Sequence, residues 1–235
     1  MIARKMREDF PIVFLGDNHG AWSTLFYEIE RRDIRDCFLI SVGDCGVGFE
    51  SKEYTLKLFE MLNRDFKERN IYFKAIRGNH DDPSYFKMGR VHLSHFELLE
   101  DYTTIKYKTK TIQFIGGATS IDRIGREKGK SYWSDEKLVF VKDRCQKADI
   151  LVTHTAPLDC FPRGFNDIVY GWANEDVNLL YDLKSEREAM DKIFQICKPT
   201  LHVYGHFHDS YSEEINGCRH RLLGIDEFWE HSHYE

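Results

Sequence analysis

The chain has 235 residues, of which 42% are hydrophobic and 31% are charged, a composition that is typical of a folded globular protein and excludes a largely disordered one. Its formal net charge of −6 provides no general attraction to a polyanion, so unspecific binding to duplex nucleic acid is disfavoured. The charged segment 1–10 lacks an apolar signal, no stretch has the length of a membrane span, and the six cysteines include no CxxC pair, so we expect a cytoplasmic protein without membrane contact or a disulfide framework.

Short runs of apolar, β-branched and aromatic residues predict buried strands in the first half of the chain. Three such runs fill residues 11–15, 37–42 and 71–76. Between them, apolar side chains recur at helical spacing over residues 22–29 and 58–66. This alternation of strand and helix predicts parallel strands joined by right-handed crossovers.

Two hairpins are predicted in the second half of the chain. Residues 103–107 and 111–115 form the first, and residues 211–215 and 219–223 form the second. The second hairpin turns at Asn216-Gly217, which is the preferred two-residue hairpin turn. Strand content on this scale indicates two packed sheets with helices outside.

Two more buried strands and two helices are expected between and after these hairpins. The strands fill residues 150–153 and 201–204. One helix begins at Ser134, a good N-cap followed by two acids, and the other runs from about residue 176 to 197 until Pro199 stops it. We find no linker, repeat or low-complexity tract, so we expect a single domain over residues 1–235.

Each of the five buried strands ends at residues that can hold a metal ion or a phosphate. In open α/β sheets, ligands gather just beyond the carboxyl ends of the strands. We therefore expect two aspartates, one asparagine and five histidines to line one crevice: Asp17, His19, Asp44, Asn79, His80, His154, His206 and His208.

These residue types predict a site for two divalent cations. Asp17 and His19 lie two residues apart and can chelate one ion together with His208. A second ion would be held by a neutral amide and two imidazoles, from Asn79, His154 and His206. Because two cations about 3.5–4 Å apart need a shared anion, we expect Asp44 to bridge them. Carboxylate and imidazole ligands without a thiolate suit manganese first, and also iron, zinc or nickel.

A dinuclear centre of this kind predicts hydrolysis of a phosphoester. Two divalent ions exceed the charge of the two aspartates, and a hydroxide and a phosphoryl group can neutralise the excess. A metal-bound water, its pKa lowered towards about 7, would attack phosphorus in line. We expect His80 to donate a proton to the leaving oxygen, and Asp81 or Asp82 to orient the ring of His80.

The loop over residues 116–127 follows a predicted strand and should lie near the crevice. Its guanidinium groups, on Arg123 and Arg126, are candidates for binding the substrate phosphate. The alternative for either arginine is a structural ion pair or an exposed position.

The motifs Asp17-Asn-His19-Gly20, Gly43-Asp44, Gly78-Asn79-His80-Asp81, His154 and Gly205-His206-Phe-His208 resemble the motif set of the calcineurin-like metallophosphoesterase superfamily. They span residues 17–208. The resemblance implies a four-layer αββα sandwich with two mixed β-sheets and a bimetallic centre. It assigns the first ion to Asp17, His19 and His208, the second to Asn79, His154 and His206, the bridge to Asp44 and the acid to His80.

The sequence departs from the phosphoprotein phosphatases of that superfamily. Their second motif continues with an aspartate and an arginine, whereas here Asp44 is followed by Cys45-Gly46-Val47-Gly48. Their third motif usually ends in glutamate, and this one ends in Asp81. The chain therefore resembles the smaller bacterial and phage phosphoesterases, which points to a phosphorylated small molecule or a nucleotide as substrate.

Two alternative functions stay open at this point. One is a nuclease or cyclic-nucleotide phosphodiesterase, although the chain lacks the long basic stripe that a duplex substrate favours. The other is a non-catalytic metal-binding scaffold. That alternative predicts eroded motifs, whereas every expected ligand and His80 are present here.

Overall fold

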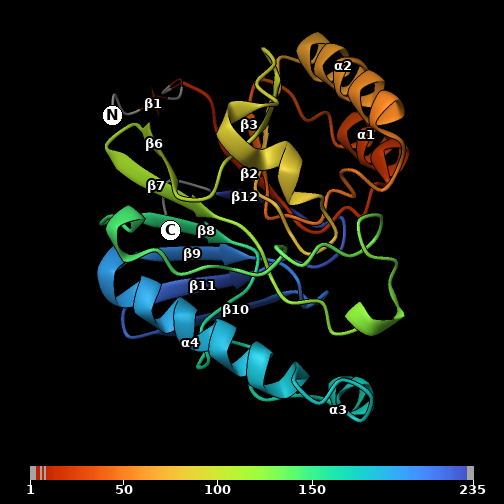
Figure 1. Cartoon of the computed structure of the whole chain (residues 1–235). Helices are drawn as coiled ribbons and strands as arrows, with labels where there is room; N and C mark the ends of the chain where they lie inside the picture. The colour runs from red at the N-terminus through yellow and green to blue at the C-terminus, as the bar shows by residue number, and fades with distance from the viewer. Residues whose placement is uncertain (1–3, 6, 8, 232–235) are drawn as a thin grey trace.

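The computed structural model describes residues 4–5, 7 and 9–231, and it contains two β-sheets stacked face to face with helices on their outer sides (Figure 1). The five-stranded sheet consists, in spatial order, of β12 (Phe228–His231), β2 (Ile12–Leu15), β3 (Phe38–Ser41), β4 (Tyr72–Ala75) and β5 (Phe96–Leu98). The seven-stranded sheet consists of β1 (Arg4–Lys5), β6 (Thr103–Tyr107), β7 (Lys110–Ile115), β8 (Ile150–Thr153), β9 (Leu201–Tyr204), β11 (Cys218–Leu222) and β10 (Tyr211–Ile215).

Helices cover the outer face of each sheet. Helices α1 (Trp22–Arg31) and α2 (Lys52–Glu68) pack on the five-stranded sheet, and α4 (Leu179–Cys197) packs on the seven-stranded sheet (Figure 1). The shorter helix α3 (Asp167–Ala173) precedes α4, and 3-10 turns occupy Pro83–Gly89, Arg123–Gly125 and Lys142–Arg144. The predicted four-layer αββα sandwich with two mixed sheets is confirmed.

The apolar core has a layer on each side of the five-stranded sheet. In β2, Val13 and Leu15 pack towards α1 and α2, whereas Ile12 and Phe14 pack between the two sheets. The seven-stranded sheet repeats this division, because Val152 of β8 faces the other sheet and Leu151 faces α4. Strands that are buried on both faces carry apolar residues at nearly every position, which explains why they were recognisable as continuous runs.

Both predicted hairpins form, and the predicted parallel pairing in the first half of the chain is observed. Strands β2, β3 and β4 are parallel neighbours, and β5 extends this parallel set. The first hairpin turns more tightly than expected, because Lys110 pairs with Tyr107. At the β10–β11 turn, Asn216 and Gly217 have φ values of 51° and 77°. Two consecutive positive φ values are what the type I′ hairpin turn requires, and asparagine and glycine adopt them most readily.

The helix predicted from Ser134 is wrong. The described backbone over residues 134–140 consists of a turn, a bend and irregular chain. The guanidinium of Arg77 donates to the carbonyl oxygens of Asp135, Glu136 and Lys137. In a helix, these carbonyl oxygens would accept hydrogen bonds from backbone nitrogens further along the chain. Here they accept from Arg77 instead.

Several short elements were not predicted from the sequence. They are β1, β5, β12 and α3, each of two to seven residues. Elements this short depend on neighbours that are distant in the chain, as β12 does on β2. Among the described residues, no helix combines the length and the apolar character that crossing a bilayer would require.

Candidate metal centre

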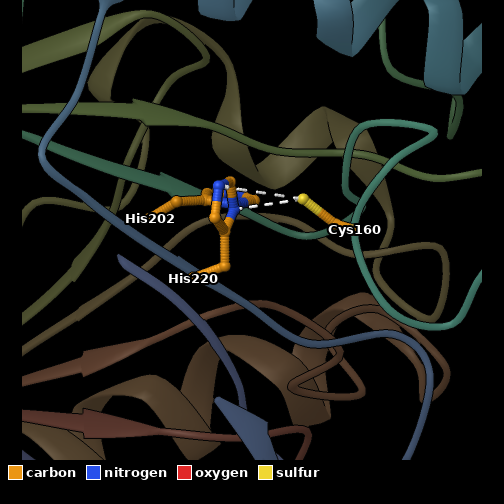
Figure 2. A group of neighbouring side chains, drawn as sticks. All are labelled: Cys160, His202 and His220. Carbon is orange, nitrogen blue, oxygen red and sulfur yellow. Dashed lines mark hydrogen bonds between the residues drawn. The ribbon is translucent and has the colours of Figure 1, made fainter. Parts of the chain in front are cut away.

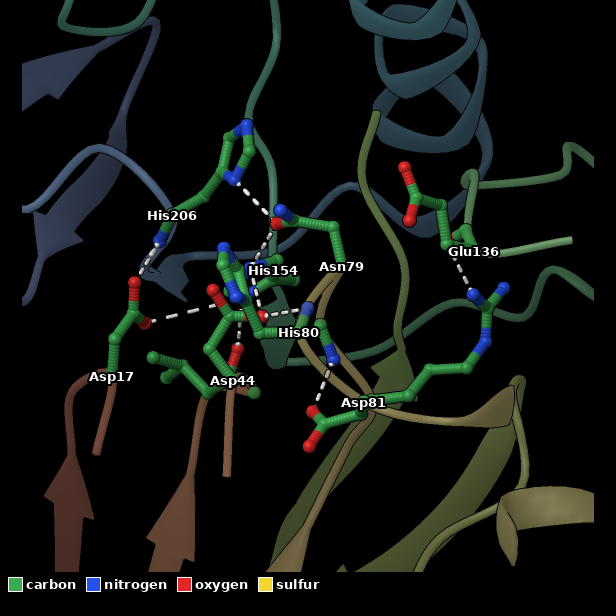
Figure 3. A network of polar contacts seen from close by, with 12 residues as sticks. Asp17, Asp44, Asn79, His80, Asp81, Glu136, His154 and His206 are labelled. Carbon is green, nitrogen blue, oxygen red and sulfur yellow. Dashed lines mark hydrogen bonds and ion pairs between the residues drawn. The ribbon is translucent and has the colours of Figure 1, made fainter. Parts of the chain in front are cut away.

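The carboxyl ends of five strands from both sheets meet at one edge of the sandwich. Strands β2, β3 and β4 bring residues from one sheet, and β8 and β9 bring residues from the other. Figure 3 shows the side chains from these ends pointing towards one another. The eight residues expected in one crevice are thus brought together by the fold: Asp17, His19, Asp44, Asn79, His80, His154, His206 and His208.

Four of these residues form one compact group of potential ligands. Asp17, His19, Asp44 and His208 each offer an atom, and these atoms lie within 4.8 Å of one another. Two imidazole nitrogens face each other here, because Nε2 of His19 lies 3.0 Å from Nε2 of His208. Among the described residues, Oδ1 of the buried Asp17 finds no hydrogen-bond partner. An unpartnered buried carboxylate oxygen beside facing imidazoles is an arrangement that a cation would stabilise.

A second group lies around the amide of Asn79. Its Oδ1 lies 2.9 Å from Nδ1 of His206 and 3.1 Å from Nε2 of His154. The other ring nitrogen of His154, Nδ1, donates to the carbonyl oxygen of Val42 at 2.8 Å, which leaves Nε2 as the free ligand atom. The donors of this group fit a second divalent ion.

Asp44 belongs to both groups. Its Oδ1 lies 3.2 Å from Nε2 of His154, and its Oδ2 lies 3.9 Å from Nε2 of His19. The two oxygens of one carboxylate therefore face the two sets of donors, as a bridging ligand requires. Ion binding by these residues stays a prediction, and the donor set fits it.

The backbone at the site is held in an unusual conformation. His19, Asp44, His206 and His208 have φ values of 50°, 52°, 73° and 54°. Residues other than glycine rarely adopt the left-handed region, and such residues cluster at functional sites where the surroundings hold them. Two glycines give the carboxylates room, because a Cβ at Gly78 would overlap Asp44 Oδ1 and a Cβ at Gly205 would overlap Asp17 Oδ1.

The buried carboxylates of the site favour positive charge beside them. Burial raises the pKa of Asp17 well above its usual value. Burial also acts to raise the pKa of Asp44, but His154, His80 and His19 together outweigh burial and hold that pKa well below its usual value. Burial opposes the charging of His154, yet Asp44 and Asp17 together raise its pKa to about 10. A metal ion bound at Nε2 of His154 would supply positive charge next to these carboxylates and would displace any proton on that nitrogen.

The ring of His80 lies beside the two groups without joining them. It makes an edge contact with the ring of His19 at 4.8 Å and stacks on Phe49 at 6.0 Å. Its Nε2 lies 2.6 Å from Nη2 of Arg126. Because a guanidinium only donates, Nε2 of His80 accepts this hydrogen bond. Burial, together with the charge of Arg126, lowers the pKa of His80 to about 4 despite the opposing effect of Asp44.

Asp81, which we expected to orient the ring of His80, lies among backbone nitrogens. Its buried carboxylate accepts hydrogen bonds from the backbone nitrogens of Gly78, Val47 and Cys45, at 2.8, 2.9 and 3.2 Å. It therefore joins the loop after β4 to the loop after β3, and a contact with the ring of His80 is not among its described interactions. The alternative, Asp82, accepts from the backbone nitrogen of Ser84 at 2.8 Å.

The two candidate arginines have different surroundings. Arg123 is an ion-pair partner of Asp176 at 2.5 Å and Asp182 at 2.6 Å, and its side chain is only 10% exposed. The structural alternative therefore describes Arg123 better than substrate binding does. Arg126 lines the site cavity beside His80 and pairs with Asp122 at 2.7 Å.

Sequence reasoning missed Ser120, which positions a site residue. Its Oγ accepts from Nδ2 of Asn79 at 3.1 Å, which directs Oδ1 of Asn79 towards the two histidines. The same Oγ accepts from Nη1 of Arg126 at 3.1 Å. A serine in a loop carries no signal that would have distinguished it before the fold was known.

A cavity of about 760 Å³ opens over the centre. Its lining includes the exposed part of the candidate centre, with Arg126 and with five of the candidate ligands, which are His19, Asp44, Asn79, His206 and His208. Apolar side chains from the loop after β8 and from α3 also line it, among them Phe161, Pro162, Phe165, Val169 and Trp172. Charged groups and potential ligand atoms together with aromatic surface suit a charged group that is attached to an organic group.

The sequence profile of the calcineurin-like phosphoesterases matches residues 10–210, and the chain belongs to this family. Membership supports metal-dependent hydrolysis of a phosphoester in general terms. No curated protein matches the sequence.

Solved structures match this chain at low sequence identity. The protein TT1561 of Thermus thermophilus is 13% identical, with a TM-score of 0.56 over 91% of this chain and 88% of that protein. The phosphopantetheinyl hydrolase of Mycobacterium tuberculosis is 13% identical, with a TM-score of 0.42 over 92% of this chain and 90% of that protein. At 13% identity, the similarity to TT1561 shows a shared fold.

Proposed function

We propose that the chain is a phosphoesterase with two divalent metal ions that hydrolyses a phosphate monoester or diester of a small molecule or nucleotide. The observation that carries this proposal is the position of Asp44, whose two oxygens face two separate sets of donors. Asp17, His19 and His208 would hold one ion, and Asn79, His154 and His206 would hold the other. When bound, two divalent ions, manganese first among them, supply an activated water and stabilise charge on the phosphoryl oxygens.

Arg126 and His80 would act on the substrate side of the centre. In the structure they form a hydrogen bond with each other, in which Nη2 of Arg126 donates to Nε2 of His80. A phosphoryl oxygen is a stronger acceptor than a neutral imidazole, so bound substrate draws the guanidinium to itself. Nε2 of His80 then no longer accepts from Arg126 and can take up a proton from the solvent, because the negative phosphoryl group favours the protonated ring. It would donate this proton to the leaving oxygen, which would otherwise depart as an alkoxide.

The cavity wall favours a phosphorylated small molecule over a duplex. Phe165 and Trp172 offer aromatic surface on which a base or an aryl group can stack. The net charge of −6 provides no general attraction to a polyanion. A cyclic nucleotide also combines a charged phosphate with an aromatic base, so it is the diester to test first.

The experiment is a panel of alkyl monoesters, nucleoside monophosphates, cyclic nucleotides and duplex DNA, each assayed with manganese, nickel and zinc. We expect metal-dependent turnover of at least one small ester and none of duplex DNA. Two bound ions without turnover of any substrate would favour the scaffold alternative instead.

The two arginines provide a matched pair of variants. We expect Arg126→Met to raise KM for a phosphate ester about 10- to 100-fold, because a hydrogen bond to a charged group contributes roughly 1.5–3 kcal/mol. Arg123→Met should leave KM within about twofold and lower Tm, since it removes the guanidinium that pairs with both Asp176 and Asp182. Steady-state kinetics and thermal denaturation measure the two effects. The reverse pattern, with KM raised only by Arg123→Met, would contradict the assignment.

A further inference from the structure

A separate cluster of potential metal ligands lies on the face of the seven-stranded sheet that α4 covers. It consists of Cys160, His202 and His220, whose ligand atoms all lie within 4.8 Å of one another (Figure 2). All three residues are almost completely buried, with exposures of 1%, 0% and 3%. The proposed reaction at the metal centre uses none of them.

The fold itself places these side chains together. His202 on β9 and His220 on β11 are direct partners in the parallel register, so both rings project from the same face of the sheet. Cys160 comes from the loop after β8. Arg187 of α4 holds this loop by donating to the carbonyl oxygens of Cys160 and Pro157, both at 2.6 Å.

Hydrogen bonding leaves a ring nitrogen of His202 free to act as a ligand. The hydroxyl of Thr153 donates to the carbonyl oxygen of Thr155 at 2.5 Å. Its oxygen must therefore accept from Nε2 of His202, which lies 2.7 Å away. With Nε2 protonated, Nδ1 of His202 carries a lone pair, as a metal-binding imidazole requires.

This nitrogen lies next to His220, which in turn contacts Cys160. Nδ1 of His202 lies 3.1 Å from Nδ1 of His220, and that nitrogen lies 3.1 Å from Sγ of Cys160. Tetrahedral zinc, with ligands at about 2.0–2.3 Å, separates its ligand atoms by about 3.3–3.6 Å. A small outward movement of the side chains would therefore open a coordination site.

The surroundings fix these ligands and moderate the charge of an ion. Phe194 stacks on His220 at 5.4 Å, and Tyr204 stacks on His202 at 4.7 Å. Glu213 accepts a hydrogen bond from the backbone nitrogen of Phe161, next to Cys160, at 2.7 Å. Glu213 also forms an ion pair with Arg163, and the thiolate of Cys160 would offset part of the charge of a divalent ion.

We propose that Cys160, His202 and His220 form a mononuclear site for a borderline-soft transition ion, with zinc as the expected occupant. Imidazole and thiolate ligands suit zinc, whereas the candidate centre at the strand ends has only nitrogen and oxygen ligands. The site would join the loop that carries Phe161 and Arg163, both of which line the cavity, to β9 and β11. It does not depend on the proposed hydrolytic function.

Cobalt substitution tests this proposal, because only a thiolate ligand gives a sulfur-to-cobalt charge-transfer band in the near ultraviolet. We expect the full-length protein saturated with cobalt to show this band. Cys160→Ser should abolish it, and His220→Gln should weaken it or shift it. Cys218→Ser is the matched control, because Cys218 is another buried thiol on the same strand as His220, and this variant should keep the band.

Metal content and Tm provide a second measurement that separates the two sites. We expect Cys160→Ser to bind one equivalent of zinc fewer than the wild type and to lose the rise in Tm that zinc produces through this site. Asp44→Asn should keep the charge-transfer band even if its strand-end centre is impaired. Absence of the band from saturated wild-type protein, or its persistence in Cys160→Ser, would show that the three side chains only share hydrogen bonds.

Discussion

Asp44→Asn is expected to lower turnover by more than about 100-fold and to reduce the metal content of the protein. Asp44 is the residue that belongs to both groups of donors, so its loss affects both ions at once. Replacing even an outer partner of a metal ligand costs about 10- to 100-fold in affinity or activity, and a shared ligand should cost more. Asparagine keeps the size of the side chain, so the change tests its charge. Elemental analysis after dialysis and steady-state assays measure the two effects.

Asp149→Asn is a suitable control for this variant. Asp149 lies directly before β8, at the end of the strand remote from His154, and its carboxylate accepts from the backbone nitrogen of Thr111 at 2.8 Å. We expect this substitution to keep the metal content and turnover of the wild type. Two bound ions per chain at normal affinity in Asp44→Asn would rule out the bridging role.

His80→Ala is expected to slow the hydrolysis of alkyl esters by about 10²- to 10⁴-fold, the usual contribution of a general acid. A nitrophenyl ester should lose far less, because nitrophenolate departs without a proton. The ring of His80 lies beside the ligands and lines the cavity, where it can reach a leaving oxygen. The measurement is kcat for both classes of ester under the same metal conditions.

His95→Ala controls for the loss of an imidazole elsewhere in the protein. The ring of His95 stacks on Tyr72 at 4.4 Å and lines a different cavity. We expect its replacement to leave kcat for both classes of ester unchanged. Equal losses for alkyl and nitrophenyl esters in His80→Ala would contradict proton donation by His80.

The strand ends could be predicted from the sequence because the signal is local. A strand buried on both faces is a continuous apolar run, and a polar residue directly after it is visible in the same stretch of chain. Asp17, Asp44 and His154 were found in this way. Since the carboxyl ends of parallel strands lie at one edge of a sheet, their convergence followed from the fold class.

The contacts between loops could not be predicted in the same way. The partners of Arg123 lie 53 and 59 residues further along the chain, and no spacing in the sequence connects them. Asp81 stands beside His80 in the sequence, yet it holds the loop after β3, because three backbone nitrogens surround its carboxylate. The contact of Arg126 with His80 likewise depends on the path of a loop that only the tertiary structure determines.

Side chains from both sheets are expected to converge on a pair of cations. X-ray diffraction from crystals loaded with manganese, recorded at the manganese absorption edge, tests this convergence most directly. We expect two anomalous peaks about 3.5–4 Å apart, with Asp44 between them, His19 and His208 beside one, and His154 and His206 beside the other. The absence of anomalous density at these residues under saturating metal, or a single peak without contact to Asp44, would contradict this account.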